Sequence, residues 1–273
     1  MNLRRRDPWA EVFLKAESNN KYERISAYSL AVGFLDLALQ AVGADTRHGA
    51  LVEHLKSYME KHPGFRYDPD SVRAAVQARN DAVHRHRIGD PGECLEQVSL
   101  LHLVWDNVRK RFVTREKAKA LAATLLGSLH VHQVMLFGSL TRTEKPSGLE
   151  DIDLLVFDDG EISALSTGYG RWNAEAVLDN VPELKTSDNQ AAIRSGWLDF
   201  VALDKALFET DENYRLTVAA RQSDPLFFLN LAQNLQEYDP TNSNWVTSRS
   251  KVFMELADIR RQLEKLGFLD KQI

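Results

Sequence analysis

The spacing of the apolar residues divides this chain into two parts, because the spacing changes from helical to strand-like near residue 114. Up to about Val113, apolar residues recur every three or four positions, which is typical of helices with one buried face. Breakers such as the run at 89–92 divide this part into segments, and the connections between the segments are short. We expect an antiparallel helical bundle with helices at about 25–42, 51–59, 68–83 and 93–112.

The second part of the chain combines strands with helices. One helix is expected at about 116–126, and short apolar runs that are typical of strands follow at 131–137, 152–157 and 197–203. Further helices are expected at about 225–233 and 245–266, and the segment 158–196 indicates loop plus helix. The predicted fold is α+β with two domains: the bundle over residues 1–114, then a mixed-sheet domain with C-terminal helices over 115–273.

The composition indicates a folded protein whose surface is not built as a whole to coat nucleic acid. Of its 273 residues, 44% are hydrophobic and 27% are charged, and the formal net charge is -5. Contact with RNA is therefore expected only at local basic patches. The single cysteine, Cys94, excludes an internal disulfide and a cysteine-type zinc site, and no apolar run has membrane-spanning length. We expect a cytoplasmic protein with no membrane partner.

Acidic and small residues gather at the ends of the expected strands. Asp151 and Asp153 are two positions apart at the start of a strand, so both side chains leave the same face and can hold hard cations. Gly138 and Ser139 follow another strand, where small residues let backbone amides approach a triphosphate. Asp199 has apolar neighbours on both sides, which is a costly place for a charge without a metal or proton partner. The pattern predicts phosphoryl chemistry at divalent cations.

The same residues resemble the polymerase β-type nucleotidyltransferase superfamily, and most closely its minimal nucleotidyltransferase branch. The resemblance spans roughly residues 116–240 and is carried by the Gly-Ser pair, the later Asp-Ile-Asp and the Leu-Asp-Phe-Val at 198–201. It implies that Asp151, Asp153 and Asp199 bind Mg²⁺, that Asp199 helps to activate an acceptor hydroxyl, and that the donor is a nucleoside triphosphate, with ATP expected. Arg142 matches the arginine that commonly follows the Gly-Ser pair, although Thr143 stands where a glycine is usual.

The alternative is a purely structural role, in which these acids only flank strands. A lone Gly-Ser pair or a lone Asp-x-Asp would favour that alternative, whereas three elements in the expected order favour a nucleotidyltransferase. The antibiotic-modifying transferases use the same aspartates, but they usually place the helical domain after the catalytic one.

A basic segment closes the helix expected after residue 68. It places Arg79, Asn80 and His84 within a run of arginines and histidines. These basic residues can be explained without any function, because cations at the C-terminal end of a helix interact favourably with the helix dipole. Alternatively, a histidine beside an arginine can assist the attack of a ribose 2′-hydroxyl on its own phosphate, which would be metal-free RNA cleavage.

Arg79 and His84 in a helical bundle resemble the HEPN family, whose arginine–histidine motif is a ribonuclease site. The two side chains project about 140° apart on an ideal helix, and a homodimer through the bundle would bring them together. HEPN and minimal nucleotidyltransferase proteins often form toxin–antitoxin pairs, in which the transferase adds AMP to a tyrosine two residues after the histidine. His86 occupies that place in this chain.

Three hypotheses follow. The first is a Mg²⁺-dependent nucleotidyltransferase that moves a nucleotidyl group, expected to be AMP from ATP, to a protein or RNA acceptor such as tRNA, fused to a HEPN-like domain. The second is a HEPN ribonuclease whose transferase half is a regulatory or nucleotide-sensing module. The third is a transferase without activity that binds nucleotide or a partner.

Overall fold

The computed structural model describes two compact units, within residues 8–44, 51–62, 67–141, 150–163, 174–221, 227–248 and 251–267. The helical unit lies within Arg6–Phe112 and Ser187–Ser195, and the sheet unit lies within Val113–Thr186 and Gly196–Ile273. The chain is α+β, with a mixed sheet and a helical N-terminal part, as predicted. Each unit is described by itself below.

The helical unit is built around the long helices α2 and α5. Its helices are α1 (Pro8–Ala16), α2 (Lys21–Ala41), α3 (Leu51–Lys61), α4 (Pro69–Arg85), α5 (Pro91–Phe112) and α8 (Ser187–Arg194). Helix α2 begins at Asn20, whose side chain accepts the Tyr22 N–H at 3.0 Å. Helix α4 begins at Asp68, which accepts two backbone N–H groups and is followed by a proline at the first helical position. These capping groups explain where two of the expected helices start.

Helix α1 adds a helix to the four that the sequence indicated. Its Trp9 is fully buried and meets the Phe34 ring edge-on, with the ring centroids 5.6 Å apart. Trp105 of α5 lies at the same centroid distance from Trp9. Aromatic burial of this kind fixes a short helix that has little stability alone.

Helix α8 packs against α2 although it comes from the segment 158–196. Ala191 and Ala192 of α8 are buried, and such small side chains let two helices approach closely. The helical unit is therefore completed by a segment that is distant in sequence.

The sheet unit contains a five-stranded mixed sheet among its described residues. The strands are β1 (Val131–Phe137), β2 (Ile152–Asp158), β3 (Leu198–Asp204), β4 (Gln236–Asp239) and β5 (Asn244–Thr247), in the order β3-β2-β1-β4-β5. Strands β2 and β3 are parallel, and the other neighbouring pairs are antiparallel. The first three strands lie where the apolar runs predicted them.

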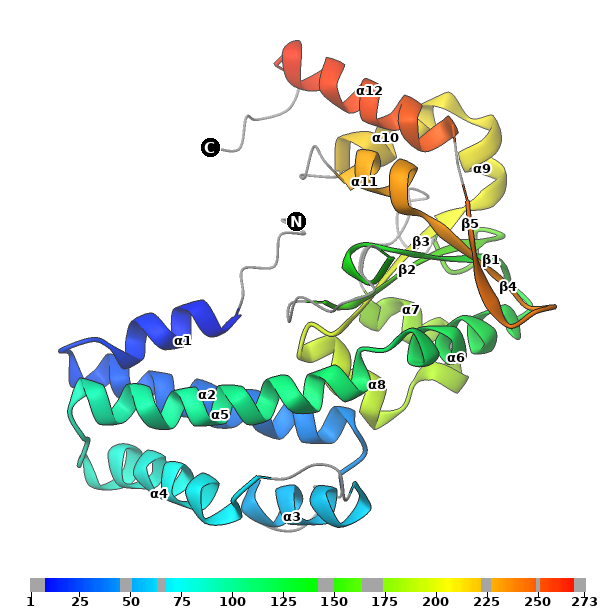
Figure 1. Ribbon diagram of the computed structural model, residues 1–273. Helices are drawn as coiled ribbons and strands as arrows, with labels where there is room; N and C mark the ends of the chain where they lie inside the picture. The colour runs from blue at the N-terminus through cyan, green and yellow to red at the C-terminus, as the bar shows by residue number, and fades with distance from the viewer. Residues whose placement is uncertain are drawn as a thin grey trace. The chain divides into compact units, whose positions relative to one another are not determined.

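Helices cover both faces of this sheet (Figure 1). Helix α6 (Arg115–Leu126) and helix α7 (Ala174–Asn180) lie on one side, together with the short 3-10 turn η2 (Pro182–Leu184). On the other side lie α9 (Lys205–Thr210), α10 (Glu212–Arg221), α11 (Phe227–Asn234) and α12 (Lys251–Lys265). The core of that side joins Leu155 and Val201 of the sheet to Phe208, Phe228 and Phe253 of the helices.

The β4–β5 hairpin corrects one prediction. Trp245 was assigned to the closing helix, but it lies in β5 and packs edge-on against Tyr238, with ring centroids 5.3 Å apart. The Asp239 carboxylate shapes the turn by accepting the Thr241 N–H at 2.9 Å and the Asn242 amide at 2.7 Å. The closing helix α12 begins only at Lys251. None of the described helices has the length and apolarity that crossing a membrane requires.

Candidate functional site

Strand pairing sets Asp153 of β2 directly beside Asp199 of β3. The two residues are partners in the parallel register, so their side chains leave the same face of the sheet from strands about 4.8 Å apart. Asp151 lies immediately before β2, two positions before Asp153. Strand register therefore sets Asp153 and Asp199 side by side, and Asp151 lies at the same end of β2.

This face is the one that α9 to α12 cover further along the strands. Leu155 and Val201 continue the alternation from the two acids and lie in the core below those helices. Asp199 is itself buried, with 8% of its surface exposed, and its Oδ1 accepts the Phe200 N–H at 3.0 Å. A carboxylate at the border of an apolar core loses much of its hydration, so a positive or hydrogen-bonding partner stabilises it strongly.

Gly138 gives the Asp153 carboxylate the space that it occupies. The residue has φ +77°, a conformation that favours glycine. A Cβ atom there would collide with Asp153 Oδ2 and would lie 3.1 Å from Asp153 Cγ. The glycine is therefore required for the backbone turn and for the close approach of the acid.

Ser139 ties the same turn to Asp151. Its hydroxyl donates to Asp151 Oδ1 at 3.3 Å, and the Asp151 N–H donates to Ser139 Oγ at 3.4 Å. The turn continues as the 3-10 turn η1 (Ser139–Thr141), where Thr141 Oγ1 donates to the Gly138 carbonyl at 2.8 Å. The Gly-Ser pair and the two acids form one connected structure. Arg142 lies outside the described residues.

The donor chemistry of this cluster suits hard divalent cations. Asp153 and Asp199 could hold a cation between neighbouring strands, with Asp151 next to the start of β2, because carboxylate oxygens are the ligands that Mg²⁺ prefers. The space that a Cβ at Gly138 would fill also lies against Asp153. As their side chains are oriented, no three His, Cys, Asp or Glu residues of the described segments form a ready metal-ligand group. Binding would therefore require the carboxylates to turn toward a common point.

The second set of predicted residues lies on α4. Arg79 is partly buried, and its Nη1 donates to Asn80 Oδ1 at 3.0 Å, whereas His84 is exposed. Within the described part of the chain, no hydrogen bond or ion pair joins Arg79 to His84. His86 ends the helix with φ 53°, and its N–H donates to the Asp81 carbonyl. One copy of α4 therefore separates the arginine from the histidine, as helix geometry predicts.

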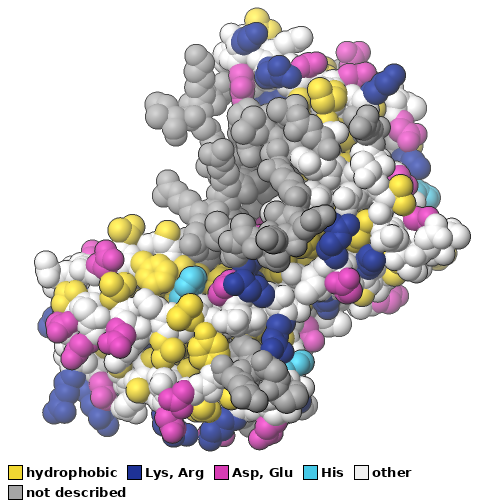
Figure 2. Space-filling model, viewed as in Figure 1, with side chains coloured by type: hydrophobic (Ala, Val, Ile, Leu, Met, Phe, Trp, Pro, Cys, Tyr) yellow, Lys and Arg dark blue, Asp and Glu magenta, His cyan; other side chains and the backbone are white. Residues whose placement is uncertain are grey.

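Charge on the helical unit is mixed in the view of Figure 2. Basic and acidic side chains alternate over the described part of that face. On α4 itself, Arg73 pairs with Asp70 at 2.6 Å and Arg85 pairs with Asp81 at 2.9 Å. The described charges of α4 are thus partly neutralised by pairs within the helix.

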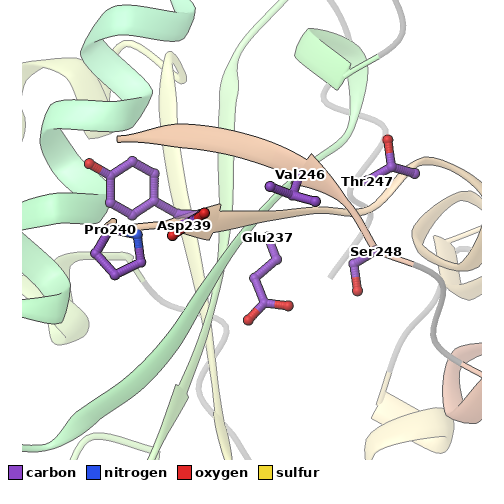
Figure 3. A pocket seen from close by; sticks show the side chains of 7 residues that line it. Glu237, Asp239, Pro240, Val246, Thr247 and Ser248 are labelled. Atoms are coloured by element: carbon purple, nitrogen blue, oxygen red, sulfur yellow. The ribbon is translucent and has the colours of Figure 1, made fainter. Parts of the chain in front are cut away.

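A groove of about 350 Å³ follows the β4–β5 hairpin (Figure 3). Glu237 and Ser248 point to one side of the hairpin and Thr247 to the other. Glu237 is the partner of Met135 in β1, so it leaves the same face as Leu155 of the core. The groove thus belongs to the sheet unit, and its strand β4 is separated from β2 by β1.

Arg115 is a residue near the site that the sequence analysis missed. It is the first residue of α6, and its guanidinium donates to the Leu140 carbonyl at 3.2 Å and to Gln236 Oε1 at 2.6 Å. One signal could have revealed it, because a cation in the first turn of a helix opposes the helix dipole and so suggests a specific partner.

Comparison with protein-family models, with curated proteins and with solved structures finds no match to this chain. The function is therefore inferred from the geometry of the two candidate sites.

Proposed function

We propose that the sheet unit is a nucleotidyltransferase that uses Asp151, Asp153 and Asp199 with the Gly138–Ser139 turn. The observation that carries the proposal is the parallel register of β2 and β3, which sets Asp153 next to the buried Asp199. Gly138 lies against Asp153, and a Cβ atom at this glycine would collide with the carboxylate. This arrangement suits a site where phosphate charge is neutralised.

The residues divide the reaction between them. The acceptor oxygen attacks the α-phosphorus, the new P–O bond forms as the α–β bond breaks, and pyrophosphate leaves. Asp199 would accept the acceptor's proton at a carboxylate oxygen, and the N–H groups of the 138–141 turn would bind phosphate oxygens. Bound Mg²⁺, held by Asp151, Asp153 and Asp199, would neutralise the triphosphate. The expected donor is ATP, and the acceptor is a protein or an RNA such as tRNA.

Transfer of label from α-³²P-labelled ATP in the presence of Mg²⁺, with tRNA and cell extract as acceptors, tests the proposal. Asp153→Asn, Asp151→Asn and Asp199→Asn should each lower labelling by at least about 100-fold, because each removes negative charge where cations and phosphate meet. Asp258→Asn is the matched control, since Asp258 is an exposed carboxylate on α12 that pairs with Arg261. Equal labelling by the three variants and the control would refute the proposal.

We infer a second candidate function for α4, metal-independent RNA cleavage by Arg79 and His84 in a homodimer. Its support is that α4 carries both the partly buried Arg79 and the exposed His84, which one copy of the helix keeps apart. The exposed His84 imidazole is accessible to RNA, and a second copy of α4 could supply the arginine.

Cleavage of RNA in EDTA tests this second function. Arg79→Ala and His84→Ala should each lower the rate by about 100-fold or more, whereas Arg73→Ala, an exposed arginine of the same helix, should keep it. Mixing the two inactive variants should restore part of the rate if the site is shared across a dimer. Cleavage that is equal in all three single variants would exclude the second function.

A further inference from the structure

Besides the Ser139–Asp151 bonds, a side chain from a different element contacts the turn after β1. Residues 138–141 follow the end of β1, and η1 has only one turn of 3-10 structure. Such short elements are rarely stable by themselves. The Leu140 carbonyl lies in this turn and accepts Arg115 Nη1 at 3.2 Å. The second arm of the guanidinium, Nη2, donates to Gln236 Oε1 at 2.6 Å.

Both ends of this bridge are firmly placed. Arg115 follows Thr114, whose hydroxyl accepts the Lys117 N–H at 3.1 Å and so fixes the start of α6. Gln236 pairs with Leu136 of β1 and with Thr247 of β5, inside the sheet. The guanidinium therefore connects a capped helix end, a sheet position and the carbonyl of the turn. Because the fork is planar and always charged, it fixes direction as well as distance.

We propose that Arg115 is the positioning residue of the Gly138–Ser139 turn, and that through this turn it sets the affinity for the triphosphate of a nucleotide. The second clause rests on the proposed transferase function. Arg115 lies on the α6 side of the sheet, because Gln236 is the partner of Leu136, whereas the acids leave the opposite face. Its effect is therefore exerted through the backbone of the turn, and the guanidinium does not touch the reacting atoms.

Local order of the turn tests the first clause without any assumption about activity. Hydrogen exchange of a peptide that covers 137–141 is compared with that of a peptide from β2 in the full-length chain. Arg115→Ala should speed exchange in the turn by on the order of tenfold, with little change in β2, because a charge-assisted bond to the carbonyl is lost. Arg115→Lys should restore part of the protection. Gln236→Ala should have a smaller effect of the same kind, since the bond to Leu140 remains.

Thr114→Ala is the matched control. It removes the cap of the same helix and keeps both guanidinium bonds, so it should weaken α6 without a selective change in the turn. Unchanged exchange in Arg115→Ala, or an equal change in Thr114→Ala, would overturn the positioning role.

Binding of Mg-ATP to the same proteins, measured by calorimetry, tests the second clause. Arg115→Ala should weaken binding by about tenfold or more, and Arg115→Lys should recover part of it. Normal affinity in an Arg115→Ala protein whose turn exchanges faster would overturn the link to nucleotide. If the unmodified chain binds no Mg-ATP, the transferase function and the nucleotide clause both fail, and hydrogen exchange still decides the positioning role.

Discussion

At the scale of single residues, the candidate centre depends on a glycine at position 138. Gly138 has no Cβ, and the Asp153 carboxylate occupies the space beside it. Ser139 then bonds Asp151 from the next position. Two neighbouring residues of one turn therefore contact two acids that are themselves only two positions apart.

Gly138→Ala should weaken both nucleotide binding and the stability of the fold. The methyl group would displace the Asp153 carboxylate, so Mg-ATP binding and label transfer should fall by more than about tenfold. The backbone cost of a left-handed alanine is about 1–2 kcal/mol, which lowers the free energy of unfolding without abolishing folding. Calorimetry and urea denaturation measure the two effects.

Gly267→Ala is the control that separates backbone strain from the collision with the Asp153 carboxylate. Gly267 has a similar φ of +75°, and a Cβ there would meet nothing within 4 Å. The control should share the backbone cost and keep nucleotide binding. A Gly138→Ala protein that binds Mg-ATP as well as Gly267→Ala does would contradict the assignment.

At the scale of elements, β1 and β2 are joined at the end opposite to the acids. The Asp159 N–H donates to the His130 carbonyl at 3.1 Å, and His130 Nδ1 donates to Asp159 Oδ2 at 2.9 Å. The hydrogen bond to Asp159 raises the pKa of His130 above its ordinary 6.5, and the same bond lowers the pKa of Asp159 below its ordinary 3.8. Both side chains are partly exposed, so the pair is screened by solvent.

This pair predicts a pH dependence of stability. A raised histidine pKa contributes stability below about 6.5, which is lost as pH rises through the raised folded-state value. A lowered aspartate pKa contributes stability above about 3.8, which is lost as pH falls through the lowered folded-state value. The difference in urea midpoint between the unmodified chain and His130→Gln should therefore be largest near about pH 5.5 and shrink by about pH 8.5.

His132→Gln provides the comparison, because His132 is an exposed histidine of β1, two positions after His130. Its difference from the unmodified chain should not show this pH dependence. A His130→Gln difference that stays constant between the two pH values would rule out the ion pair as its source.

The elements differ in how much of them the sequence predicted. Strands β1, β2 and β3 were found because most of their residues are buried, so that each strand is a nearly continuous apolar run. The hairpin β4–β5 was missed because its strands are short and half-exposed, and Trp245 and Val252 together imitate a helical spacing. Its clearest signal was the turn at Asp239 and Pro240.

The candidate site was predicted to a similar degree. Short-range spacing named Asp151, Asp153, Gly138 and Ser139, and the isolated acid in an apolar run named Asp199. The register that makes Asp153 and Asp199 partners is a long-range property, as is the reach of Arg115 to Gln236. No local pattern encodes either, because both depend on which segments pair in three dimensions.

At the scale of the whole molecule, the described part of the chain passes between its two units after Phe112, after Thr186 and after Ser195. The first passage leads through Val113 and Thr114 into Arg115, and the last leads through Gly196 toward Asp199. The helical unit is thus covalently continuous with Arg115, which bonds the Leu140 carbonyl, and with β3, which carries Asp199. Tension on α5 or α8, such as a partner bound to the helical unit would exert, would therefore act on these two positions along peptide bonds.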